Sequence, residues 1–162
     1  MADMLNDGNI RLTYVPAIAD PAAPTTTELT AGIDLECLVT ADGLNISVDE
    51  ETVSVQKLCE TSNSQAPGRS TYGITLTIVR QDEETEDVGW TTLKRGTAGF
   101  LVMRYGVAHD QAWAASDKVQ VFPGKCGERR PQQPEANGAT LFQSQWFVGK
   151  QPSLDGVVAS GV

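Results

Sequence analysis

Between Ser70 and Arg80 large apolar and hydroxyl side chains alternate along the chain. The apolar residues take every second position: Tyr72, Ile74, Leu76 and Ile78. Threonines take most of the positions between them. Because successive side chains of a strand point to opposite faces, this spacing predicts a strand with one buried and one polar face. It is the clearest local pattern in the sequence, and it favours a β-rich fold.

Further strands are predicted wherever short apolar or alternating runs lie between turn residues. They are residues 10–15, 35–40, 100–103, 117–122 and 139–148. Asp42-Gly43 and Pro123-Gly124 are typical turn pairs, and residues 124–138 have the composition of a loop. Residues 44–68 are acidic, rich in Ser and Thr and weakly patterned, which predicts a long hairpin or excursion loop.

Helix signals occur at two places. Thr25 and Glu28 have the spacing of a capping box, which predicts a helical turn that ends at Gly32. Residues 83–95 begin with acids and end with Lys94 and Arg95, which predicts a longer helix that Gly96 terminates. We therefore expect one domain over residues 1–162, an antiparallel β-sandwich or barrel with one flanking helix.

Charge is distributed unevenly along the chain. Residues 1–87 hold 16 acids and 4 bases, a balance of −12, whereas residues 88–162 hold 5 acids and 8 bases, a balance of +3. An acidic surface repels phosphates, so tight DNA binding is disfavoured. Two interpretations fit this pattern equally well: solvated acidic loops, or a dipolar subunit that packs head-to-tail with copies of itself.

No pattern is typical of a catalytic, cofactor or metal site. The neighbours of His109, the only histidine, give no signature of a Ser-His-Asp or Cys-His site. Cys37, Cys59 and Cys126 include no Cys-x-x-Cys pair, which favours buried free thiols. The ligand spacing of an EF-hand and the glycines of a phosphate loop are missing as well. We expect no catalytic, cofactor-binding or metal-binding residues and no enzyme activity.

No apolar run approaches the length of a membrane span, and the start of the chain lacks the pattern of a signal peptide. We therefore expect no membrane partner and folding in the cytosol of the cell that makes the protein.

Several short runs form an ordered set over most of residues 5–158. They are residues 24–35, 38–44, 65–69, 92–102, 110–121, 126–128 and 133–137. In this order they resemble the major tail tube proteins of long-tailed actinobacterial phages, the siphophages. No single run is diagnostic; the ordered set carries the resemblance.

The resemblance implies a structural virion protein that forms stacked hexameric rings, the hollow tail tube through which the DNA genome passes into the host. It implies assembly in the bacterial cytoplasm with copies of itself and with the tape measure, tail terminator and distal tail proteins. Residues 1–8, 149–162 and about 44–68 would be the N-terminal arm, the C-terminal arm and the long loop that reach neighbouring subunits. Weakly patterned arms of this kind order on binding.

A lumen that lets DNA pass should repel phosphates. The acids expected in the lumen or between rings are those of the 42–60 region: Asp42, Asp49, Glu50, Glu51 and Glu60. A second acidic cluster is expected to cap the flanking helix: Asp82, Glu83, Glu84, Glu86 and Asp87.

Two other functions remain open at this point. A tail terminator or connector would form one ring and stop. A capsid-decorating or carbohydrate-binding β-sandwich would need exposed aromatic residues, which Trp90, Trp113 and Trp146 could supply. Tryptophans at strand and helix positions more often belong to the core.

Overall fold

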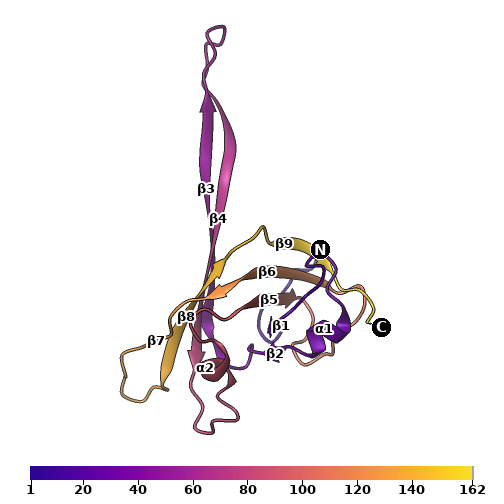
Figure 1. The fold of residues 1–162 in the computed structure, drawn as a ribbon, viewed down its shortest axis with the longest axis vertical. Coiled ribbons are helices and arrows are strands. Elements are labelled where there is room, and N and C mark those ends of the chain that lie inside the picture. Colours follow the sequence, from indigo (N-terminus) through magenta and orange to yellow (C-terminus); the bar gives the residue numbers. More distant parts are fainter. Residues whose placement is uncertain (162) are drawn as a thin grey trace.

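The computed structural model describes residues 1–161, which form nine strands in one antiparallel sheet and two short helices (Figure 1). The strands are β1 (Ile10–Val15), β2 (Ile33–Asp34), β3 (Val39–Val55), β4 (Ser64–Val79), β5 (Ala98–Tyr105), β6 (Lys118–Cys126), β7 (Arg130–Pro131), β8 (Leu141–Val148) and β9 (Ser153–Val157). The helices are α1 (Thr26–Thr30) and α2 (Val88–Thr92). The predicted mainly β, antiparallel fold is confirmed.

The sheet runs in the order β2-β1-β5-β6-β8-β4-β3, with β9 beside β6 and β7 beside β8. β6 forms the corner, because its first part pairs with β9 and its last residues, Gly124–Cys126, pair with β8. Among residues 1–161 the sheet does not close on itself, since β2 and β3 remain its two ends. β1 and β5 thus face β8 and β4 across a shared core.

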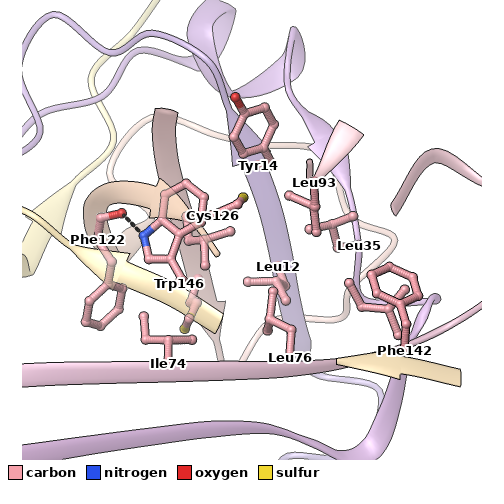
Figure 2. Close-up of a cluster of buried hydrophobic side chains, with 13 residues drawn as sticks. Leu12, Tyr14, Leu35, Ile74, Leu76, Leu93, Phe122, Cys126, Phe142 and Trp146 are labelled. Atoms are coloured by element: carbon pink, nitrogen blue, oxygen red, sulfur yellow. Dashed lines mark hydrogen bonds between the residues drawn. The ribbon is translucent and has the colours of Figure 1, made fainter. Parts of the chain in front are cut away.

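The main core lies between these two parts of the sheet (Figure 2). Trp146 of β8 is 2% exposed, and its Nε1 donates a hydrogen bond of 3.1 Å to the carbonyl oxygen of Phe122. The ring of Tyr14 meets Trp146 edge-on at 6.1 Å between centroids. Ile74 and Leu76, two of the alternating residues of β4, are buried against this centre. The alternation at residues 70–80 therefore predicted the strand and its buried face correctly.

A second apolar cluster covers the opposite face of β1, β5 and β6. Val15 and Val102 contribute from the sheet, Leu29 from α1 and Val158 from the C-terminal segment. α1 begins where the sequence predicts it. Thr25 accepts a hydrogen bond from the Glu28 backbone N–H, and the Glu28 carboxylate accepts one from the Thr25 N–H, which is the predicted capping box.

The expected helix over residues 83–95 is wrong in extent. α2 is five residues long, Val-Gly-Trp-Thr-Thr, and all five residue types have low helix propensity. Residues 82–86 form bends and turns before it. Lys94 and Arg95 follow after its end, so neither acids nor bases lie in its terminal turns. Gly96 does take a left-handed conformation, with φ 86°, but in the turn that leads to β5.

Two predicted turns lie inside strands. Asp42-Gly43 belongs to an irregularity in β3, where the register with β4 shifts between Val39 and Leu44. A Cβ on Gly43 would lie 2.8 Å from the carbonyl oxygen of Thr77, so close approach of two strands explains this glycine. β6 runs through Pro123-Gly124, and a Cβ on Gly124 would collide with the carbonyl oxygen of Phe147.

The segment expected as a strand at residues 35–40 is mostly a turn. The N–H of Leu38 donates to the carbonyl oxygen of Leu35 at 2.9 Å, and β3 begins at Val39. Leu35 points inward and is fully buried, which accounts for its apolar character.

The predicted loop at residues 124–138 contains the end of β6 and all of β7.

The C-terminal segment is docked on the body, although its weak pattern suggested disorder in the isolated chain. β9 pairs with β6, and Val158 is 2% exposed. The N–H of Val158 donates to the carbonyl oxygen of Asp117, and the N–H of Ser116 donates back to that of Val158, each at 2.8 Å. The expected arm thus includes a strand and a core residue. Val162 lies outside the described residues.

Candidate assembly surface

β3 and β4 continue far beyond the body as a two-stranded hairpin (Figure 1). β8 pairs with β4 only over residues 73–79, so residues 64–72 have no strand partner except β3. β3 is the last strand of the sheet, and its outer edge is free along the hairpin. At about 3.3 Å per residue, the stretch from Leu44 to Val55 is roughly 36 Å long. Both edges of this arm can therefore pair with further strands.

The first part of the hairpin has two chemically different faces. Paired residues share a face, and the apolar face carries the pairs Leu44–Leu76, Ile46–Ile74 and Val48–Tyr72. The polar face carries the pairs Asn45–Thr75, Ser47–Gly73 and Asp49–Thr71. The apolar face continues outward from the core, because Ile74 and Leu76 are members of it.

Outside the body these apolar side chains lose their cover. Val48 is 47% exposed, Val53 47% and Val55 55%. Ile46 and Leu58 are exposed as well. An isolated two-stranded hairpin is only marginally stable in water. The hairpin thus has free edges and exposed apolar residues both before and after its acidic middle, residues 49–51. Such a surface is typically covered by another chain.

The five acids expected in the lumen or between rings all lie exposed on this hairpin, but they do not form one site. Asp42 lies in the irregular base of β3, and Asp49, Glu50 and Glu51 follow one another in its middle. From Asp42 to Glu50 the strand covers roughly 27 Å. Glu60 lies in the tip loop, where its carboxylate is 3.8 Å from the Lys57 ammonium. The acids are thus spread along the arm, and because Asp49 and Glu50 are successive strand residues, they lie on both of its faces.

The second acidic cluster does not cap α2. Asp87 is the residue before the helix, yet its side chain makes no cap hydrogen bond. Its buried carboxylate instead accepts from Arg80 Nε at 2.7 Å and from the Gln81 N–H at 3.2 Å. The other four members, Asp82, Glu83, Glu84 and Glu86, are exposed. Figure 1 shows α2 at the opposite end of the molecule from the hairpin tip.

Trp90 next to this cluster lies between two guanidinium groups. Arg80 and Arg129 each place their Cζ 4.0 Å from the centroid of its ring. Arg129 Nη1 also donates to the Trp90 carbonyl oxygen at 2.8 Å. Trp113 and Trp146 are 8% and 2% exposed. The three tryptophans therefore offer no exposed aromatic platform, and no local sequence signal indicated the Arg80–Trp90–Arg129 stack.

A shallow apolar groove lies beside β9. Its volume is about 610 Å³, and its lining includes Met4, Tyr105, Leu154 and Val157. Leu154 and Val157 are 43% and 45% exposed. The groove is a second apolar surface, on the body of the molecule.

Burial favours the neutral forms of two titratable groups of the main core, Cys126 and Tyr14. Burial raises the pKa of the Cys126 thiol to about 12. Burial, and to a lesser degree the neighbouring Cys126, raises the pKa of Tyr14. Cys126 is the expected buried thiol, whereas Cys37 and Cys59 are exposed, contrary to the prediction for them. Cys126 is not activated as a nucleophile.

The sequence matches the family described as "Phage tail tube protein" over residues 1–161. The chain belongs to the phage tail tube protein family. This match confirms the predicted resemblance at the level of the family. No curated protein matches the sequence.

A phage tail tube protein is a structural component of the virion, and the family is not a family of enzymes. The helices of this tail tube protein each span five residues, and within residues 1–161 no helix is long and apolar enough to cross a membrane.

Proposed function

We propose that this tail tube protein is the repeating subunit of a siphophage tail, assembling into hexameric rings that stack into the tube through which the genome passes. The observation that carries the proposal is the hairpin of β3 and β4, with its two free edges and its uncovered apolar side chains. Hydrogen bonding between the hairpins of neighbouring subunits would pair the free backbone N–H and C=O groups of both edges. Repeated around a ring, the same pairing closes a barrel and leaves no edge.

The two faces of the hairpin suggest how it is oriented in that barrel. The face with Asp49, Thr71 and Thr75 is polar, so it suits a wet lumen. The face with Ile46 and Val48 suits contact with the bodies of neighbouring subunits. Acids in a lumen repel DNA phosphates, which keeps the genome from sticking to the wall. We assign Asp42, Asp49, Glu50, Glu51 and Glu60 to the lumen or to the contacts between rings.

Stacking of rings needs a different, heterologous contact. Surfaces that suit it are the exposed residues 1–8, the exposed side chains of residues 149–161, the apolar groove beside β9 and the acids at residues 82–86. The positive balance of residues 88–162 supplies the complementary charge. In the virion, the tape measure protein would lie within the tube, and the terminator and distal tail proteins at its ends, after assembly in the bacterial cytoplasm.

Electron microscopy of the purified protein tests the proposal. Wild type should form long tubes of uniform width. A variant in which Asn-Gly replaces residues 49–71 should remain folded and monomeric, because Val48 and Tyr72 form a pair that a two-residue turn can close. Its near-ultraviolet circular dichroism should match that of wild type, since Trp113 and Trp146 lie in the body.

The same images separate the alternatives. Single rings would indicate a terminator or connector, and monomers under all conditions would indicate a decorating module. Tubes formed by the shortened variant would show that the hairpin does not carry assembly.

A further inference from the structure

Three side chains with metal-binding atoms converge next to β1. Glu36 and Cys37 come from the turn between β2 and β3, and His109 comes from the loop after β5. Their ligand atoms all lie within 4.8 Å of one another. The Cys37 Sγ is 4.0 Å from His109 Nδ1, and a Glu36 carboxylate oxygen is 3.7 Å from the same nitrogen.

The backbone on both sides of the cluster is held in place. The His109 N–H donates to the carbonyl oxygen of Gly8 at 2.9 Å, and the Leu35 N–H donates to that of Leu12 at 2.7 Å. Arg11 joins the two segments, because it donates to the Gln111 carbonyl oxygen at 2.6 Å and to Asp34 at 3.0 Å. The three side chains therefore meet because the fold brings rigid segments together.

Cys37 Sγ and His109 Nδ1 are just within hydrogen-bonding range of a sulfur, but the Glu36 carboxylate has no such partner in the cluster. The side chain of Glu36 is only 12% exposed, and its Oε2 has no hydrogen-bond partner. The 3.7 Å between its other oxygen and His109 is too long for a hydrogen bond. Beside them lies a cavity of about 340 Å³, which Asp7 also lines. A buried carboxylate oxygen without a protein partner, beside a thiol and an imidazole, forms a set of atoms that can bind a metal cation.

We propose that Glu36, Cys37 and His109 bind one zinc ion, through a carboxylate oxygen, Sγ and Nδ1, with water at the fourth position. Zinc takes these three ligand types, whereas calcium and magnesium prefer oxygen alone. In a tetrahedral site the ligand atoms are about 3.4–3.6 Å apart, from metal–ligand distances of about 2.0–2.3 Å. The observed 4.0 Å and 3.7 Å are close to these values, and the third separation, between the Glu36 oxygen and Cys37 Sγ and within 4.8 Å, must shorten further by side-chain rotation.

The ion would act as a structural clip. It would join residues 72 positions apart, the turn at the base of the hairpin and the loop after β5. An ion that binds only the folded chain stabilises it. A site with one histidine and one cysteine escapes sequence patterns that require repeated His or Cys pairs, which is why no metal site was expected.

Cobalt is the probe for the test, because a thiolate bound to Co²⁺ gives a charge-transfer absorption in the near ultraviolet. The untagged full-length protein is stripped with a chelator in a non-thiol reductant and titrated with Co²⁺. Wild type should bind one equivalent with this absorption, and added Zn²⁺ should displace the cobalt and raise the Tm. Cys59→Ser is the matched control, since Cys59 is exposed at the hairpin tip and outside the cluster.

Cys37→Ser should abolish the absorption, and His109→Gln should weaken cobalt binding at least tenfold. Both variants should keep the circular dichroism of the metal-free wild type, because both side chains are partly exposed. The proposal is overturned if wild type gives no thiolate absorption, if Cys37→Ser keeps it, or if Zn²⁺ leaves the Tm of wild type unchanged.

Discussion

Substitution of Val48 by lysine should block tube formation and leave the subunit folded. Val48 pairs with Tyr72 on the apolar face of the hairpin and is 47% exposed in the single chain. Lysine is therefore easily hydrated in the free subunit. The lysine disfavours assembly once a neighbouring subunit covers this face. Its ammonium group must then reach water from within an apolar contact, which restricts the side chain.

The magnitude follows from the exposed fraction. Full burial of a valine side chain contributes about 1.5–3 kcal/mol, so covering the exposed half of Val48 contributes about 1 kcal/mol per subunit. Immobilising the lysine side chain costs up to about 2 kcal/mol more. The total of about 3 kcal/mol corresponds to roughly a hundredfold increase in the concentration needed for assembly.

The assay is sedimentation of tubes over a series of protein concentrations, with electron microscopy of the pellets. Ser47→Lys is the control, because it adds the same charge to the polar face, one residue away. We expect its critical concentration to lie within about threefold of wild type, since that face remains hydrated. Equal impairment of both variants, or normal assembly of Val48→Lys, would refute the assignment of the faces.

Two further predictions concern the stability of the subunit. The Thr25 backbone N–H, and to a lesser degree that of Ala19, lowers the pKa of Glu28 below its ordinary value of 4.5, while partial burial opposes the shift. The stabilisation this carboxylate provides is therefore complete above pH 4.5 and is lost as the pH falls through its lower, folded-state pKa. Glu28→Gln should be less stable than wild type at neutral pH and should lose less of its free energy of unfolding on acidification. Urea unfolding at several pH values measures this difference. Parallel curves of the free energy of unfolding against pH for the two proteins would contradict it. Val158→Ala should lower the free energy of unfolding by about 2 kcal/mol, because Val158 is 2% exposed in the second cluster. Val157→Ala, at a position 45% exposed, should change it by less than about 0.5 kcal/mol. Equal effects of the two alanines would mean that the C-terminal segment does not dock as described.

Local patterns predicted the elements that a local cause determines. The alternation around Ile74 and Leu76 reflects one buried face of β4, and the Thr25–Glu28 spacing is itself the interaction that begins α1. Two glycines led to wrong turn predictions, because the strand that passes close to each of them is distant in sequence. Gly43 and Gly124 resemble turn residues, but each allows another strand to approach closely.

The hairpin was harder to delimit, since residues 45–67 lie outside the core that imposes a pattern on β4. The charge pattern of residues 83–95 likewise suggested a helix that the low propensity of Val-Gly-Trp-Thr-Thr limits to one turn. The buried contacts of charged side chains gave no signal at all. Arg104, one residue beyond the strand predicted at residues 100–103, is 1% exposed in β5, and it holds the following loop through Ala108, Gln111 and Asp117.

The continuity of β4 from the arm into the core has a mechanical consequence for the subunit. One continuous strand forms half of the projecting arm and, through Ile74 and Ile78, part of the core. A pull along the arm loads the seven β4–β8 pairs from Gly73–Phe147 to Val79–Leu141 in shear, so they must yield together rather than one after another. A pulling force applied at the tip is thus transmitted along β4 directly to the centre of the subunit.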